Sequence, residues 1–211
     1  LNFEISSGKN KPLSFKNVSQ LISKAEVRFT NFEMTTPGPL AFPSAISGGT
    51  WAKAAPDVVQ IIYDYGFNII NWANNHTLDY LYQGIEDTKR NLTEYGFVEA
   101  GVGNNLAEAS CPKYLECPSG RVALIAAVSS CPEFWVAGEQ RPDMIGRPGV
   151  NPLRFSTKYV LPEKELSVLK EIAKKTYINA DKDLAIKEGF SIAEEEGVFT
   201  FGGHRFIKGT E

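Results

Sequence analysis

The chain has 211 residues, of which 43% are hydrophobic and 22% are charged, and its formal net charge at pH 7 is −3. These values fit one large globular domain, or most of one. The slight negative charge and the scattered Lys and Arg residues give no electrostatic footprint for a nucleic acid. No apolar run approaches the roughly 20 residues that span a bilayer.

Helices and strands alternate over the first hundred residues. Apolar spacing and Gly or Pro stop signals predict helices over 15–24, 56–65 and about 81–95, and strands over 27–32 and 68–73 and near Val98. Strands that alternate with helices of this length favour βαβ units, the α/β class and a sheet with parallel strands.

The second half begins with a predicted hairpin, 114–117 and 121–128, turned by Pro118, Ser119 and Gly120. Because segment 122–128 is continuously apolar, it predicts a central buried strand. A connection rich in Pro and Gly follows over 131–152, and loops of that length are typical of functional or mobile segments. Beyond it we predict an amphipathic helix over 162–175 and interpret the Lys/Glu-rich region through Glu196 as a solvated face.

The cysteines are Cys111, Cys117 and Cys131, and they form no Cys-x2-Cys pair of the kind that binds zinc. Their odd number argues against a full disulfide framework. A bridge between Cys111 and Cys117 across the hairpin is one alternative. Free thiols that pack as small hydrophobic groups are the favoured interpretation.

Polar residues follow the apolar strand over 68–73. Asn75, His76 and Asp79 come directly after it, and His76 is one of only two histidines in the chain. In open α/β sheets, ligands bind beyond the carboxyl ends of the strands. An imidazole can bind a metal or move a proton, and an Asn carbonyl is a neutral oxygen ligand. The alternative is that Asn74 and Asn75 shape a turn and His76 caps the next helix.

A second strand, over 27–32, also ends in polar residues. Asn31 and Glu33 are two apart, so both project from one face of the strand. Taken alone, Glu33 fits a solvated carboxylate at a strand end. Together, two strand ends with Asn/Glu and Asn/His favour a site for a hard divalent cation.

The long connection and its end carry Arg147, Asn151 and Arg154. Two guanidiniums and an amide suit a phosphate or a carboxylate. The alternative is that both arginines form ordinary surface salt bridges. Because the connection follows the apolar strand that ends at Ser129, we expect segment 146–154 to close over the cleft that Asn75 and His76 face.

Several short motifs occur in order over most of residues 15–154. They are Asn31-Phe32-Glu33, Gly66-Phe67-Asn68, Ala73-Asn74-Asn75-His76-Thr77-Leu78-Asp79-Tyr80, Gly84-Ile85, Thr88, Leu92, Gly101-Val102-Gly103-Asn104-Asn105, Glu108-Ala109 and Gly146-Arg147-Pro148-Gly149-Val150-Asn151-Pro152-Leu153-Arg154. In this order they resemble the CapA-type poly-γ-glutamate capsule-synthesis proteins, which belong to the calcineurin-like metallophosphoesterase superfamily. The resemblance implies a layered α/β sandwich with mixed sheets, incomplete in this chain. It also implies a single partial domain over 1–211, with a core over 15–154 and an insert or peripheral region over 155–211.

The resemblance also implies roles for single residues. Glu33 and Asn75 would bind a divalent metal, either Mn, Mg, Fe or Zn, and His76 would be the catalytic imidazole that contacts or protonates the substrate. Two-metal sites of this kind activate a water and neutralise phosphoryl oxygens. The expected substrate-binding residues are Asn31, Asp79, Arg147, Asn151 and Arg154.

The sequence also departs from the family pattern. The family usually opens with a strand that ends in Gly-Asp and closes with motifs near His-Trp-Gly and Gly-His-x-His, and none of these occurs in this chain. His204 fits neither histidine motif. We therefore expect the chain to be a piece of a longer protein, with an incomplete metal site and little activity of its own. Residues 1–4 show no signal peptide, which says little about the compartment of a piece of chain.

The leading hypothesis is a metal-dependent phosphoesterase-like domain in the biosynthesis of capsule, poly-γ-glutamate or another cell-surface polymer. It would act on an anionic polymer or a phosphorylated small substrate, alongside other capsule-synthesis proteins. The alternative is a non-catalytic domain that retains the fold and binds an anionic polymer. The resemblance implies a cell-surface or membrane-associated extracellular location, with the cytoplasm as the alternative.

Overall fold

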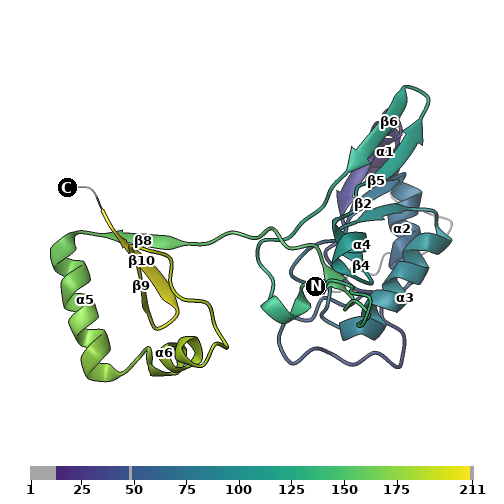
Figure 1. Ribbon diagram of the computed structural model, residues 1–211. Helices are drawn as coiled ribbons and strands as arrows, with labels where there is room; N and C mark the ends of the chain where they lie inside the picture. Colours follow the sequence, from purple (N-terminus) through teal and green to yellow (C-terminus); the bar gives the residue numbers. More distant parts are fainter. Residues whose placement is uncertain (1–12, 48, 210–211) are drawn as a thin grey trace. The chain divides into compact units, whose positions relative to one another are not determined.

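The computed structural model describes residues 13–47 and 49–209 (Figure 1). The helices, including the short 3-10 helix η1, are α1 Leu13–Ile22, α2 Asp57–Tyr65, α3 Leu81–Glu94, α4 Leu106–Ser110, η1 Glu133–Trp135, α5 Glu163–Thr176 and α6 Ala180–Lys187. The strands are β1 Phe29–Asn31, β2 Ile69–Asn71, β3 Val98–Ala100, β4 Val102–Gly103, β5 Lys113–Cys117, β6 Gly120–Leu124, β7 Gly149–Val150, β8 Lys158–Leu161, β9 Val198–Phe201 and β10 His204–Lys208. The chain divides into two compact units, Leu1–Arg154 and Phe155–Glu211. The expectation of a single partial domain with its core over 15–154 stays a prediction.

The first unit contains a sheet of three short parallel strands in the order β1-β2-β3. In its register Asn31 lies opposite Asn71, and Asn71 lies opposite Ala100. Helices α2 and α3 connect these strands along the chain, as parallel strands require. The predicted alternation of strands and helices, and with it the α/β class, is confirmed.

Glycine positions fix the ends and the packing of the helices that flank this sheet. Gly66 follows α2 with φ 98°, a left-handed conformation, and its amide donates to the carbonyl of Tyr63. Gly84 lies inside α3, where an added Cβ would lie 2.6 Å from the Cβ of Tyr80. The lack of a Cβ at Gly84 therefore leaves room for the Tyr80 side chain at the start of α3.

The core of the first unit lies directly under the strand ends. Phe32 and Trp72 follow β1 and β2 and are fully buried, together with Ile70 and Trp135. Because side chains alternate along an extended chain, burial of Phe32 turns its neighbours Asn31 and Glu33 outward. The packing of the core thus decides which polar groups reach the edge of the sheet.

The predicted hairpin is confirmed, but the prediction of a central buried strand over 122–128 is wrong. β6 ends at Leu124 and pairs with β5 in a two-stranded sheet that projects from the unit (Figure 1). Val122 and Ile125 are 37% and 68% exposed. An apolar run shows that a segment can be buried, but burial also needs a neighbour on each face. In β6, Leu124 is partly buried against the core, and Ala126 and Val128, which follow the strand, are buried.

The second unit holds a separate three-stranded sheet in the order β8-β10-β9. β10 runs parallel to β8 and antiparallel to β9, and α5 packs on β9 and β10. The amphipathic helix was predicted, whereas the three strands were not. Helix α6 has no buried residue, which agrees with the expected solvated face.

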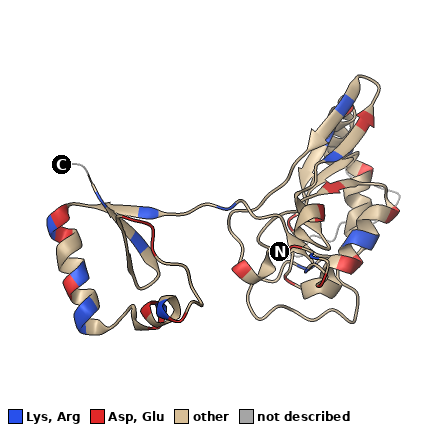
Figure 2. Cartoon of the chain, in the orientation of Figure 1, with Lys and Arg blue, Asp and Glu red and all other residues tan. Residues whose placement is uncertain are grey.

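Charges of both signs are interspersed in each unit (Figure 2). The three cysteines are free, which confirms the thiol interpretation, but Cys111 is exposed, so it does not pack as a buried hydrophobic group. No helix among the described residues combines the length and the apolar character needed to cross a membrane.

Candidate functional site

Amide and carboxylate side chains form a chain of hydrogen bonds at the carboxyl ends of β1 and β2. The Nδ2 of Asn71 donates to the Oδ1 of Asn31 at 2.8 Å, and the Nδ2 of Asn31 donates to the Oε2 of Glu33 at 3.2 Å. The Oδ1 of Asn71 accepts from the amide of Ala73 at 3.0 Å. Asn31 and Glu33 are exposed, so this relay holds the Glu33 carboxylate at the solvent edge of the sheet.

Sequence reasoning missed Asn71. The register of the parallel pair β1 and β2 identifies it, because this register places Asn71, the last residue of β2, opposite Asn31, the last residue of β1. The strand boundaries predicted from the sequence extended past Asn71 to residue 73. Its position at a strand end was therefore not visible.

A tight turn after β2 carries Asn74, Asn75 and His76. Asn74 is buried, and its Nδ2 donates to the carbonyl of Phe32 at 2.9 Å while its Oδ1 accepts from the amide of His76 at 3.0 Å. Asn74 therefore shapes the turn, as one of the alternatives held, and ties it to the end of β1. Glu33 directly follows Phe32 on the same sheet edge, and Asn75 is half-buried in the same turn.

The imidazole of His76 is paired with a buried carboxylate. Its Nδ1 lies 2.7 Å from the Oδ2 of Asp79, and the two side chains are 12% and 0% exposed. In a neutral imidazole one ring nitrogen donates and the other accepts, so donation from Nδ1 leaves Nε2 free for proton transfer or metal binding. Because Asp79 is fully buried, its carboxylate contacts the imidazole instead of making the expected contact with the substrate.

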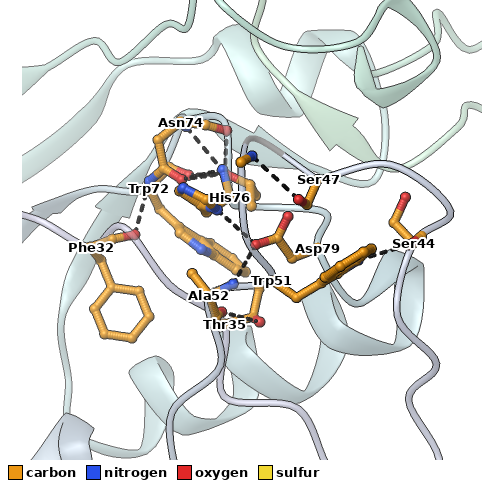
Figure 3. A network of polar contacts seen from close by, with 12 residues as sticks. Phe32, Thr35, Ser44, Ser47, Trp51, Ala52, Trp72, Asn74, His76 and Asp79 are labelled. Atoms are coloured by element: carbon orange, nitrogen blue, oxygen red, sulfur yellow. Dashed lines mark hydrogen bonds and ion pairs between the residues drawn. The ribbon is translucent and has the colours of Figure 1, made fainter. Parts of the chain in front are cut away.

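The connection between β1 and α2 packs against Asp79 from the other side (Figure 3). The amide of Ala52 donates to the Oδ2 of Asp79 at 2.6 Å, and the amide of Ser44 donates to the Asp79 carbonyl at 2.7 Å. The indole Nε1 of Trp51 donates to the carbonyl of Ser44 at 2.7 Å. The Oδ1 of Asp79 has no hydrogen-bond partner among the described residues. The pairing of His76 therefore depends on a segment distant from it in the sequence.

The start of the same connection is fixed by a second buried carboxylate, that of Asp87 in α3. Asp87 accepts from the amide of Gly38 at 2.7 Å, from Arg90 at 2.7 Å and from Gln83 at 3.2 Å. Burial alone would raise the pKa of Asp87. The hydrogen bonds from Gly38, Arg90 and Gln83 outweigh it and hold the pKa below its ordinary value.

The three residues expected from the long connection lie in different surroundings. The Nδ2 of Asn151 donates to the carbonyl of Ala126 at 2.8 Å, and its amide donates to Gly101 at the end of β3, so Asn151 braces the backbone. The guanidinium of Arg147 donates to the carbonyl of Val136 at 3.0 and 3.2 Å. Arg154 is exposed. Neither arginine forms a salt bridge within 13–47 and 49–209. Closure of segment 146–154 over the site stays a prediction.

The described residues do not bring together a complete set of acidic, imidazole and thiol metal ligands. No group of three or more His, Cys, Asp or Glu side chains that could hold a metal ion occurs among them. Glu33 contributes a carboxylate and the turn contributes amides and an imidazole. In chemical type these donors suit a hard divalent cation, but they are too few to enclose it.

Comparison with known proteins gives a match over most of the chain. Residues 8–186 match the model of a family described as bacterial capsule synthesis protein PGA_cap. The matched range includes every residue expected in the site, and it ends within α6.

Curated proteins also match part of the chain. Two uncharacterized proteins of Sinorhizobium fredii are each 35% identical over 161 residues, which is 75% of this chain and 35% of the relative. A protein of Mycobacterium tuberculosis named as a probable polyglutamine synthesis accessory protein is 32% identical over 91 residues, which is 41% of this chain and 24% of the relative. The chain thus spans about a third of the length of the Sinorhizobium relatives.

Proposed function

Because the chain belongs to the bacterial capsule synthesis family PGA_cap, we propose that it supplies one side of a metal-dependent phosphoesterase-type site that serves capsule or poly-glutamate biosynthesis. Its substrate would be an anionic polymer or a phosphorylated small molecule. Its partners would be other capsule-synthesis proteins, and its location the cell surface. The metallophosphoesterase-like α/β fold of the family fits the mixed sheets and helices of this chain.

The pair formed by His76 and Asp79 is the observation that carries this proposal. A buried carboxylate 2.7 Å from Nδ1 favours the tautomer that carries its proton on Nδ1 and orients the imidazole ring. Nε2 can then give a proton to a leaving oxygen or take one from a water. A positioned general acid or base of this kind contributes about 10²–10⁴-fold to a rate.

Glu33 and Asn75 are the proposed metal ligands of this side of the site. Glu33 is exposed and held through Asn31 by Asn71, so its carboxylate is oriented before a metal binds. A bound divalent metal would activate a water and neutralise phosphoryl charge. A complete shell needs more acidic or imidazole ligands than the described residues bring together.

Binding of an anionic polymer without catalysis is the second candidate function. Two observations on the described residues favour it, namely the incomplete metal shell and the lack of carboxylate partners for Arg147 and Arg154. Exposed guanidiniums without an intramolecular carboxylate suit the carboxylates of a polyanion.

The test measures manganese-dependent hydrolysis of an aryl phosphodiester by the full-length protein and by residues 1–211 alone. We expect turnover by the full-length protein that falls about 10²–10⁴-fold in His76→Gln, and little turnover by residues 1–211. His204→Gln is the matched control, because it alters the other histidine, which lies in the second unit.

Two outcomes would contradict the proposal. Turnover by residues 1–211 that survives His76→Ala would place the chemistry elsewhere. Inactivity of the full-length protein, together with calorimetric binding of oligo-γ-glutamate that weakens in Arg154→Ala, would favour the non-catalytic function.

A further inference from the structure

The connection between β1 and α2 contacts Asp79 at two points, one on each side of residue 48. Ser44 donates its amide to the backbone carbonyl of Asp79, and Ala52 donates its amide to the carboxylate. The indole of Trp51 donates to the carbonyl of Ser44 at 2.7 Å and so links the two points (Figure 3). Trp51 therefore links the two described stretches, 44–47 and 49–53, both of which contact Asp79.

The carboxylate of Asp79 uses one oxygen for both of its contacts. Oδ2 accepts from the amide of Ala52 at 2.6 Å and lies 2.7 Å from the Nδ1 of His76, while Oδ1 has no partner among the described residues. Rotation of the carboxylate is therefore opposed at this oxygen by a backbone amide from the connection and by the imidazole. The position of Ala52 determines where Oδ2 meets the ring.

Trp51 differs from the two tryptophans of the core. Trp72 and Trp135 are fully buried, whereas Trp51 is 45% exposed. Much of its ring is thus not used for packing, while its N–H is used to join the two ends of the connection. The residues that follow Ala52 and Asp79 are also in contact, because the Nζ of Lys53 lies 5.5 Å from the centre of the Tyr80 ring.

We propose that Trp51 is a positioning residue for His76 and acts through Ser44, Ala52 and Asp79. Trp51 holds the amide of Ala52 against the Oδ2 of Asp79. This oxygen accepts the proton on the Nδ1 of His76, which leaves the Nε2 of the ring without a proton. This inference rests on the proposed function in one respect, which is that His76 is the reacting group. The hydrogen-bonded path itself is formed by residues of this chain.

The test is nitrogen-15 NMR of the imidazoles in residues 1–211. The chain has only two histidines, so His76→Gln assigns both, and His204 in the second unit is an internal reference. We expect His76 to be a single tautomer with a slowly exchanging Nδ1 proton. Trp51→Phe, which removes the indole N–H and keeps an aromatic ring, should speed that exchange about two- to tenfold. The His204 signals should not change.

Two further variants decide the result. Ile46→Ala truncates another exposed side chain of the same connection and should leave the exchange rate as in the wild type. Asp79→Asn removes the charged acceptor and should change the His76 signals more than Trp51→Phe does. The proposal is overturned if Trp51→Phe leaves His76 unchanged, if Ile46→Ala has an equal effect, or if Asp79→Asn has none.

This measurement needs neither metal nor substrate. A negative result therefore removes the role of Trp51 and leaves the esterase assay untouched. A positive result with an inactive full-length protein removes the proposed enzymatic function and leaves the role of Trp51 standing.

Discussion

The two compact units hold their polar groups in different ways. In the first unit, Asn74, Asp79 and Asp87 are buried, and each is hydrogen-bonded to a backbone group. In the second unit, carboxylates such as Glu163 and Glu195 form ion pairs at the surface. Hydrogen bonds to buried polar groups favour one geometry, whereas exposed ion pairs are screened by water and contribute little.

This difference explains why the candidate site lies in the first unit. The proposed role of His76 in proton transfer needs a fixed ring orientation, and the buried carboxylate of Asp79 lies 2.7 Å from its Nδ1. Among the described residues of the second unit, Leu166, Ala173 and Thr200 are buried, so this unit offers few buried positions that could hold a polar group. Substitutions in the core, at a buried carboxylate and at a surface ion pair therefore test whether the two units are stabilised in different ways.

The largest effect is expected from the core of the first unit. Trp72 is fully buried next to the turn that carries His76, so Trp72→Ala should lower the free energy of unfolding by about 3–5 kcal/mol. Leu166→Ala in the second unit should cost about 2 kcal/mol, the low end for such truncations, because fewer buried neighbours surround it. Urea denaturation followed by circular dichroism measures both.

The exposed Leu40 provides the control, because Leu40→Ala should stay within about 0.5 kcal/mol of the wild type. If Trp72→Ala costs no more than Leu166→Ala, the core of the first unit contributes no more to stability than the core of the second.

The fold of the first unit could be predicted largely from its sequence because its signals are local. The apolar face of α3 and the Gly residues after α2 and α3 set the helix ends, and the alternation of elements favoured parallel strands. The exposed β6 shows the limit, since an apolar run does not reveal whether a neighbouring strand exists. In the second unit, short strands such as β8 give patterns too brief to distinguish from a loop.

The candidate site could be located from the sequence but not assembled. Its position at the strand ends followed from the order of motifs. The partners did not, because Asn71 depends on the register of β1 and β2, and the contact of Ala52 with Asp79 joins residues 27 apart in the chain. The burial of Asp79 depends on that same distant segment, so it could not be read from the sequence. Asp79 was therefore expected to face the substrate.

The second prediction concerns the buried carboxylate of Asp87. Asp87→Asn removes a charged acceptor from the amide of Gly38 and from Arg90, so it should cost about 1–3 kcal/mol at pH 7. The pKa of Asp87 is lowered on folding, so its contribution is present above the ordinary value of 3.8 and is lost as pH falls through the folded-state value. The stability difference between wild type and variant should therefore shrink in acid.

Urea denaturation at several pH values measures this difference. Glu86→Gln, an exposed carboxylate on the same helix, is the matched control and should change little. A difference between wild type and Asp87→Asn that stays constant down to the lowest pH would assign the loss to packing rather than to charge.

The smallest effect is expected from Glu195 in the second unit. Glu195 lies 2.7 Å from Lys158 and 3.2 Å from Arg205, which are opposite each other in the register of β8 and β10. The hydrogen bond and charge of Lys158, followed by the charge of Arg205, lower the pKa of Glu195, so its stabilisation is lost as pH falls. Glu195→Gln leaves two cations side by side and should lower Tm slightly at low salt.

The salt dependence of this effect separates the two units. At about 1 M salt the Debye length is about 3 Å, so exposed charges no longer interact and the Tm difference caused by Glu195→Gln should vanish. The loss caused by Asp87→Asn should persist in the same buffer, because salt does not reach a buried hydrogen bond. If the Glu195→Gln loss is unchanged in high salt, Glu195 holds β8 and β10 together by hydrogen-bond geometry, and the second unit relies on fixed polar contacts as the first unit does.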